Sequence, residues 1–286
     1  MNVTKDNRIE VTGIVESINL IKGSTDKAGP FIRGDLVITA KVGKTMNIPI
    51  PFFAAHKTKA GKVRKLYTQL ENLQQGMRIN VVGSIEDNKF WDQTRGQLVK
   101  TKRLRLNFIN DARNEDPDKA EFIYSGFVTS PLQEKFNKNG DSIGFEIGIA
   151  QATYNNDRAM NVFFQVDGSN TKAINYITSE YTPATTIKVT GSLDYDIDTV
   201  TVEEQVDFGN PIIRTYQNRT SNLMIESGKV LTEEIYERDV IDQLLAADKE
   251  DDQEVQAKAK NTEVSGNSVS NASPQTAKTK VNQSLI

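Results

Sequence analysis

The chain has no cysteine and only one histidine among its 286 residues. The absence of cysteine excludes disulfide bonds and thiolate metal sites, and it favours a reducing compartment. The first residues lack the apolar core of a signal peptide, and no apolar run approaches the length of a membrane span. These absences predict a soluble protein of the cytoplasm.

Catalytic and metal-binding patterns are also scarce. His56 lies in a strongly cationic segment that opposes its protonation, and no second histidine or carboxylate cluster accompanies it. The segment Gly43-Lys44-Thr45 resembles the end of a phosphate-binding P-loop, but Ile38 occupies the place of the first glycine and a strand is expected to follow. We therefore reject nucleotide hydrolysis.

Three carboxylates, Asp194, Asp196 and Asp198, alternate along a predicted hairpin and offer ligands for a cation. An EF-hand also needs a glycine and a distal glutamate, which this segment lacks, so a solvated turn is the favoured interpretation. We predict that the chain is not an enzyme and that it has no catalytic residues, no metal site and no cofactor.

What the chain does have is a strong asymmetry of charge. Residues 1–113 contain 20 Lys and Arg against 10 Asp and Glu, whereas residues 114–286 contain 15 against 28. The overall net charge of −3 conceals this division. A basic first part followed by an acidic second part indicates that only the first part is built to meet a polyanion.

The chain also repeats itself. Residues 79–85 and 187–193 share one alternation of apolar residues, and each segment contains a Gly-Ser pair. Three further echoes keep the same order, namely residues 11–15 with 124–128, 46–48 with 160–162, and Phe108 with Phe208. A repeat of about a hundred residues is the size of a domain with its own core. The sequence therefore predicts two copies of one small β domain.

Each copy shows the same order of predicted elements, strands by period two and helices by period 3.6. In the first copy we expect strands over residues 9–15, 36–40, 46–52, 79–85 and up to 108, and a helix over residues 66–73. In the second copy we expect strands over residues 122–128, 143–150, 160–166, 187–193 and 200–208, and a helix over residues 171–179. The order β-β-β-α-β-β is that of the OB-fold, a five-stranded barrel. Gly13 and Gly126 stand where a strongly bent first strand needs a residue without a side chain.

The predicted fold class is all-β with short helices: two tandem OB-fold barrels, then a helix and a disordered C-terminal tail. The expected boundaries are residues 1–113 for the basic barrel, 119–218 for the acidic barrel, 219–260 for a helical segment with an acidic run, and 261–286 for the tail. A polar joint over residues 110–118 separates the barrels. Thr232 is the expected N-cap of a helix over residues 231–247, which packs on either barrel. The tail has almost no large apolar side chains, so it cannot offset the entropy of ordering.

In an OB-fold, the ligand lies across the second and third strands, between the loops that join strands one to two and four to five. In the first copy these segments are basic and aromatic, which suits single-stranded nucleic acid, because exposed bases stack on rings while phosphates bind Lys and Arg. The candidate nucleic-acid-binding residues, including the cationic cluster around His56, are Lys22, Lys27, Phe31, Arg33, Lys57, Lys59, Lys62, Arg64, Lys65, Lys89, Phe90, Trp91, Arg95, Lys100, Lys102, Arg103 and Arg105.

Other interpretations stay open at this stage. Phe90 and Trp91 also suit a plug at the end of the barrel, and the run of Lys and Arg also suits a solvated surface. In the second copy the charge is reversed, with 7 Lys and Arg against 13 Asp and Glu over residues 119–218. Phe163 and Tyr154 leave only a weak stacking surface there, so we expect this barrel to pack against a protein partner or a second subunit.

Over about residues 8–216, this repeat architecture resembles tandem OB-fold single-stranded DNA-binding proteins, and the Lys-, Asn- and Ile-rich composition is similar to that of phage replication proteins. The resemblance implies a non-catalytic protein that coats and protects single-stranded DNA in replication or recombination, in the bacterial host cytoplasm if the chain is phage-encoded. It leaves the choice between DNA and RNA open. The rival interpretation is a structural or adaptor protein whose barrels serve protein contacts, as in virion assembly.

The resemblance also bears on partners. Such families often carry an acidic C-terminal tail that recruits replication and repair enzymes and shields the DNA groove. Here the acidic run over residues 248–254 lies well before the end, and the terminal Leu285-Ile286 lacks an acidic lead-in. We expect replication or recombination partners to bind the second barrel or this tail, and the chain to be able to form a homo-oligomer.

Overall fold

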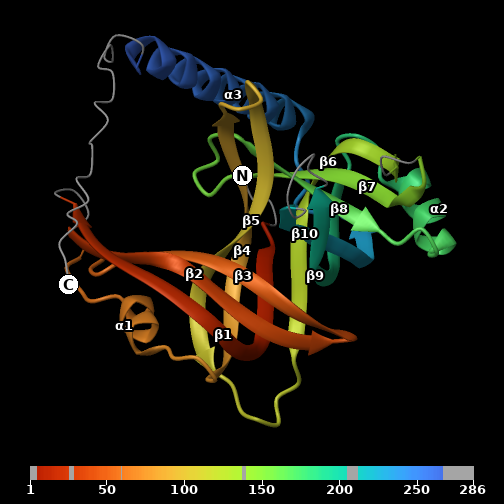
Figure 1. Ribbon diagram of the computed structural model, residues 1–286. Coiled ribbons are helices and arrows are strands. Elements are labelled where there is room, and N and C mark those ends of the chain that lie inside the picture. The colour runs from red at the N-terminus through yellow and green to blue at the C-terminus, as the bar shows by residue number, and fades with distance from the viewer. Residues whose placement is uncertain (1–4, 26–28, 59, 137–139, 205–211, 267–286) are drawn as a thin grey trace, which may run out of the picture.

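The computed structural model describes residues 5–25, 29–58, 60–136, 140–204 and 212–266, and these residues form ten strands and three helices (Figure 1). The first barrel contains β1 (Asn7–Thr25), β2 (Gly29–Val42), β3 (Lys44–Ala55), α1 (Lys65–Asn72), β4 (Arg78–Asp92) and β5 (Gln97–Asp111). The second contains β6 (Lys119–Phe136), β7 (Ser142–Ala152), β8 (Ala159–Val166), α2 (Thr171–Glu180), β9 (Thr186–Glu204) and β10 (Ile212–Val230), and α3 (Arg238–Gly266) follows. The order β-β-β-α-β-β occurs twice, so the prediction of an all-β fold with tandem OB-fold barrels is confirmed.

The alternation read from the sequence places the core. On β3, Ile48, Ile50 and Phe52 point inward, and Phe53 on the opposite side is 55% exposed. Near the end of β5 the alternation fails, because the ladder with β4 shifts register at Val82 and Gly83. This bulge turns Phe108 outward, with 65% of it exposed, although alternation from Leu104 and Leu106 places it inside.

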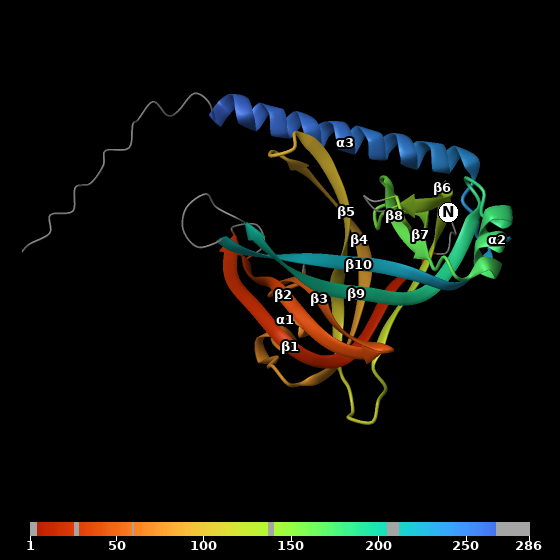
Figure 2. The ribbon, with the colours of Figure 1, turned by 45° about the vertical axis from the view of Figure 1, so that its right-hand side comes forward.

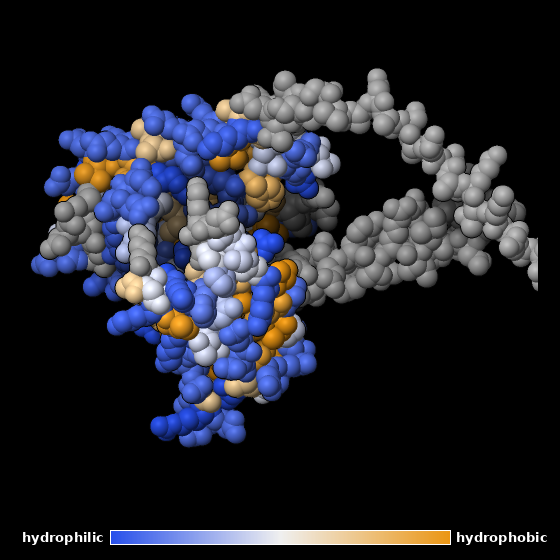
Figure 3. All heavy atoms as spheres, turned by 90° about the vertical axis from the view of Figure 1, so that its left-hand side faces the viewer, coloured by the Kyte–Doolittle hydropathy of each residue, from blue (hydrophilic) through white to orange (hydrophobic). Residues whose placement is uncertain are grey.

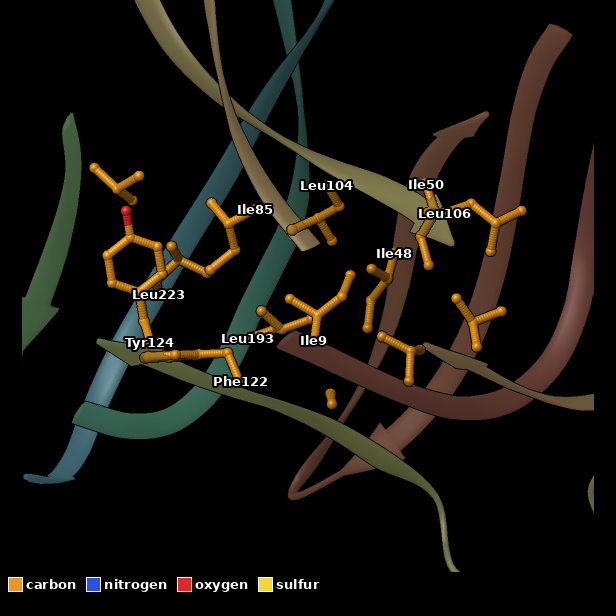
Figure 4. Close-up of a cluster of buried hydrophobic side chains, with 14 of the residues drawn as sticks. Ile9, Ile48, Ile50, Ile85, Leu104, Leu106, Phe122, Tyr124, Leu193 and Leu223 are labelled. Atoms are coloured by element: carbon orange, nitrogen blue, oxygen red, sulfur yellow. The ribbon is translucent and has the colours of Figure 1, made fainter. Parts of the chain in front are cut away.

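The two barrels are joined through their first strands. β1 pairs antiparallel with β6, from Asn7 opposite Tyr124 to Thr12 opposite Lys119. Ile9 pairs with Phe122, its own counterpart in the repeat, so the barrels are related as the subunits of a two-fold dimer are. Buried side chains from both barrels form one cluster across the pairing of β1 with β6, as Figure 4 shows.

Close backbone approach explains the repeated glycines. A Cβ atom on Gly13 or Gly126 would overlap the carbonyl oxygen of Thr39 or Ala150 on the neighbouring strand, so both strands require glycine there, as predicted. The Gly-Ser pairs have the same cause, since a Cβ on Gly83 or Gly191 would overlap a carbonyl oxygen of the fifth strand in its barrel.

The barrels differ in how they close. In the second, β8 pairs with β10 in parallel, at Gln165 and Met224. In the first, β3 and β5 lie in contact, but among the described residues β5 forms its ladder with β4 alone. The first barrel therefore has an open seam between β3 and β5.

Three predictions about the elements are wrong. The loop expected over residues 22–30 is wrong at both of its ends, because β1 continues to Thr25 and β2 begins at Gly29; residues 26–28 lie outside the described residues. The fifth strand of the second barrel is β10, since residues 200–204 continue β9; Phe208 lies outside the described residues. β10 also carries the barrel past residue 218 to Val230.

The C-terminal helix also differs from its prediction. It begins at Arg238 and not at residue 231, because Tyr236 is anchored in the second barrel: its hydroxyl oxygen accepts a hydrogen bond from the Ala152 amide, and its own amide donates to the Thr186 hydroxyl. Thr232 therefore does not cap it. α3 continues to Gly266, so residues 261–266 are helical, and residues 267–286 lie outside the described part of the chain.

α3 spans both barrels. Ile241 and Leu244 pack with Tyr236 and Phe127 on the second barrel, and the next turns cross the tip of the β4–β5 hairpin, as Figures 1 and 2 show. No helix among the described residues combines the length and apolarity that a membrane span requires. Figure 3 shows a largely hydrophilic surface in which hydrophobic residues gather in short strips.

Candidate nucleic-acid interface

The projecting part of the β4–β5 hairpin, residues 86–103, is called the arm below, and strand alternation gives it two sides. Cross-strand partners share a side, so Lys89 lies with Lys100, whereas Glu86 lies with Arg103 on the other. α3 contacts the first side through ion pairs, and this is the covered side of the arm. The second is the open side. The candidates on the arm and on the part of β5 just beyond it divide between these two sides. Lys89, Trp91, Lys100 and Lys102 are on the covered side, and Phe90, Arg103 and Arg105 are on the open side.

An ion-pair cluster fills the covered side. The Lys89 ammonium, on a side chain only 7% exposed, lies 2.5 Å from Asp248, 3.0 Å from Asp251 and 2.8 Å from Asp252. Burial opposes its charge, but the hydrogen bonds to the three aspartates outweigh burial and raise the pKa of Lys89. Lys100 also pairs with Asp252. The three carboxylates converge closely enough to hold a metal ion, yet a lysine ammonium already occupies their centre.

Lys102 lies further along the covered side, where it is half-buried next to the second barrel. Burial lowers the pKa of its ammonium to about 8, and Glu146 only partly opposes that shift. Its ammonium lies 3.5 Å from the carbonyl oxygen of Phe163. This side chain therefore points toward β8 of the second barrel and away from the open side of the arm.

Lys102→Met is expected to raise the free energy of unfolding at pH 7 by about 1–3 kcal/mol, because a charged folded lysine with a lowered pKa costs stability. Between pH 8 and 10.5 the unfolded wild type binds more protons than the folded form, so wild-type stability rises and the gain shrinks. Urea unfolding at pH 7 and pH 10 measures it. Lys249→Met, at an exposed site on α3, is the control with little expected change. A gain that does not depend on pH would contradict the explanation.

The open side presents two arginines held by one carboxylate. Glu86 pairs with Arg105 at 2.6 Å and with Arg103 at 3.2 Å, and both guanidinium groups remain more than half exposed. Since a guanidinium has five N–H donors, each arginine retains donors for a phosphate. Pro51, Phe53 and these side chains line a hollow of about 320 Å³ over the seam between β3 and β5.

Aromatic rings lie next to this hollow. Phe31 of β2 and Phe53 of β3 stack with their ring centroids 5.2 Å apart. The Phe31 ring covers Gly23 of β1, where a Cβ atom would overlap it, so the ring rests on backbone. Arg33 pairs with Phe53 across the strands and is exposed. This surface, Phe31, Arg33 and Phe53, is the aromatic platform.

A larger groove separates the first barrel from the β7–β8 turn of the second. Its volume is about 980 Å³, and five cationic side chains and three carboxylates line it, so its net charge is positive. Arg64, just before α1, lines the groove together with Arg103, Arg105 and Phe108 of β5. Tyr154 lines it from the β7–β8 turn. The groove therefore joins the open side of the arm to the second barrel.

Two equivalent ion pairs join the barrels, and one of them lies in this groove. Arg158, at the end of the β7–β8 turn, contacts Asp87 of β4 at 2.6 Å. Lys44, at the corresponding end of the β2–β3 turn, contacts Asp194 of β9 at 2.8 Å. Each barrel thus reaches the fourth strand of the other. Asp194 engages a lysine of its own chain, and the side chains of Asp196 and Asp198 are outside the described residues.

The other candidates that the structure describes do not line this groove. Lys22 pairs with Glu71 of α1 at 2.7 Å, and Arg95 pairs with Asp92 at the tip of the arm. Lys57, Lys62 and Lys65 are exposed around the loop before α1. Lys27 and Lys59 fall outside the described residues.

The nucleic-acid-binding residues predicted from the sequence do not include Phe53, Glu86 and Phe108, which line the site, and the sequence indicates Tyr154 only as part of a weak stacking surface. One signal was present for Phe53, because a Phe52-Phe53 doublet in a strand must point one ring outward. The sequence offers no comparable signal for Phe108, whose exposure depends on the bulge at Asn107 of β5. Glu86 looks like an ordinary surface acid until its pairing with Arg103 and Arg105 is known.

Comparisons with known proteins agree with this architecture. The model of one family, described as YorF, matches residues 5–262. No curated protein matches the sequence. Among solved structures, the wild-type single-stranded DNA binding protein from Thermus aquaticus superposes with a TM-score of 0.52 at 12% identity, covering 80% of this chain and 95% of that one. This similarity shows a shared fold.

Two further solved structures are also similar. A deletion mutant of the Thermus aquaticus protein gives a TM-score of 0.49 at 13% identity and covers 82% of this chain and 98% of that one. The small single-stranded DNA-binding protein from Streptomyces coelicolor gives 0.27 at 17% identity, covering 38% of this chain and 96% of that one.

Proposed function

The chain belongs to the YorF family, and we propose that it is a non-catalytic protein that binds single-stranded DNA. The observation that carries the proposal is the neighbourhood of the stacked Phe31–Phe53 pair and the exposed guanidinium groups of Arg103 and Arg105. Bases of any sequence can stack on aromatic rings. A guanidinium group can bind a phosphate in a bidentate manner, through two N–H donors. The fold shared with the Thermus aquaticus single-stranded DNA binding protein supports the same proposal.

The arrangement favours a single strand over a duplex. The aromatic platform is open to solvent at the Phe53 ring, which needs an unpaired base to cover it. In a duplex the bases stack on one another, so the rings would gain nothing and only the cations would contribute. We propose that the protein coats and protects single strands in phage DNA replication or recombination.

The candidates contribute unequally in this proposal. The proposed binding surface lies on the open side of the arm and on the aromatic platform next to it, and Arg64 extends it along the groove. Its residues are Phe31, Arg33, Phe90, Arg103 and Arg105. Of the four on the covered side, Lys89 and Lys100 engage aspartates of α3. The acidic run of α3 is proposed to compete with DNA for them, while replication or recombination proteins bind the second barrel or the tail.

Titration of labelled oligonucleotides tests the proposal. Fluorescence anisotropy with single-stranded DNA, single-stranded RNA and duplex DNA, each at two salt concentrations, is expected to show tightest binding to a single strand. Affinity is expected to fall as salt rises, with a slope of about −0.7 for each phosphate contact. Equal affinity for the duplex would contradict the role of the rings. No binding at low salt would favour the adaptor protein instead.

A further inference from the structure

We infer that a bound single strand runs from the first barrel onto the second, and that Tyr154 is the stacking residue that the second barrel contributes. The inference rests on the proposed function and adds a residue and a path to it. It assigns a nucleic-acid contact to the barrel whose charge is acidic, where electrostatic attraction alone predicts none.

The first observation is the exposure of Tyr154. Its side chain is 98% exposed, the largest fraction among the large apolar and aromatic side chains that are exposed in the described part of the chain. Aromatic rings contribute most when they are covered, so a ring held fully in water is available to a ligand with a flat apolar face. The ring lines the groove together with Phe53, Phe108 and Arg105 of the first barrel.

The second observation is that the turn carrying this ring is held in place. Thr153 and Arg158 close it with a backbone hydrogen bond of 3.0 Å, and Asn156 takes a positive φ of 58° within it. Arg158 is paired with Asp87 of β4, and Lys5 donates to the side-chain oxygen of Asn156. The middle of the turn thus contacts Lys5, just before β1, and its end contacts β4 of the first barrel. A ring on a fixed base loses little freedom when a base stacks on it.

The third observation is the distribution of charge in the groove. Arg64, Arg103 and Arg105 all belong to the first barrel, while Asp157 follows Tyr154 in the turn. The cation that the second barrel contributes to the groove, Arg158, is already paired with Asp87 and Asp248, so the more exposed cations lie on the wall of the first barrel, and the opposite wall offers a ring. A strand that passes through the groove would place its backbone toward the arginines and a base toward Tyr154.

Length dependence separates this path from a site confined to the first barrel. One OB-fold binds roughly 4–16 nucleotides, so an oligo-dT of about 6 nucleotides fits the first barrel, and one of about 25 reaches both. Tyr154→Ala is expected to weaken the long oligonucleotide about tenfold and to change the short one less than about twofold. Tyr154→Phe is expected to retain wild-type affinity, because it keeps the ring.

The control variant is Tyr176→Ala, which removes a tyrosine that is 45% exposed on α2 and does not line the groove. It is expected to bind both oligonucleotides as the wild type does. Unchanged affinity of Tyr154→Ala for the long oligonucleotide would overturn the path, and so would an equal loss for both lengths. If the wild-type protein binds neither length, the proposed function itself fails. Thermal unfolding of each variant verifies that the fold is intact.

Discussion

Replacing Arg103 and Arg105 together by alanine is expected to weaken binding of single-stranded DNA roughly 100-fold at low salt, about 2.8 kcal/mol. Both guanidinium groups are exposed beside the aromatic platform, and a hydrogen bond to a charged group contributes about 1.5–3 kcal/mol. The loss of two phosphate contacts should also make the salt slope shallower by about 1.4. Anisotropy titrations over a series of salt concentrations measure both quantities.

A matched control removes the same charge elsewhere. Arg113 in the joint and Arg238 at the start of α3 are 80% and 69% exposed and do not line the groove. Their double alanine variant is expected to retain affinity within about threefold, since exposed charges at a distance are screened. A similar loss in both double variants would mean that net charge governs binding and that the open side is not the site.

How far the sequence predicts this molecule depends on the range of the interactions involved. Period-two alternation is a local property, so the strands around Ile48 and Ile79 and both short helices are found where the pattern places them. The glycine positions are equally readable, because Gly13 and Gly126 each meet a carbonyl oxygen that the fold always brings there. Element boundaries that depend on a distant contact cannot be predicted from local sequence. One example is the start of α3, which follows the contacts of Tyr236 with the second barrel.

The candidate site shows the same division more sharply. Alternation in the arm shows that Lys89 and Lys100 share a side and that Arg103 has the other. Which side remains open is decided by α3, about 150 residues later in the chain. A helix with an acidic run is predictable, but its docking on Lys89 is a tertiary event that no local pattern specifies. The sequence therefore indicates the cations of the arm but not which of them α3 engages.

Lys89→Met is expected to lower the free energy of unfolding by about 3–5 kcal/mol, the cost of removing one partner from a buried ion pair. Three aspartates converge on this ammonium, and Asp248 and Asp252 are themselves largely buried. Without Lys89, their charges lose their central partner, and α3 loses its strongest attachment to the first barrel. Urea unfolding measures the loss, and limited proteolysis within α3 reports release of the helix.

Acid is expected to act on the same cluster. Burial raises the pKa of Asp252, but hydrogen bonds from Lys100 and Lys89 outweigh it, so the pKa of this carboxyl lies below its ordinary value. A lowered folded pKa contributes stability that is present at neutral pH and is lost as pH falls through the folded pKa. In the Lys89→Met variant this acid-dependent loss should be smaller, because one of the two lysines that lower the pKa of Asp252 is removed.

Two controls identify the cause of the Lys89 effect. Lys22→Met breaks the exposed pair with Glu71 and is expected to cost less than about 1 kcal/mol. Adding Asp248→Asn, Asp251→Asn and Asp252→Asn to Lys89→Met is expected to recover most of the lost stability, because uncompensated charge, and not the missing side chain, is the main cost. If the quadruple variant is no more stable than Lys89→Met alone, packing of the lysine stem holds α3 and the electrostatic explanation is wrong.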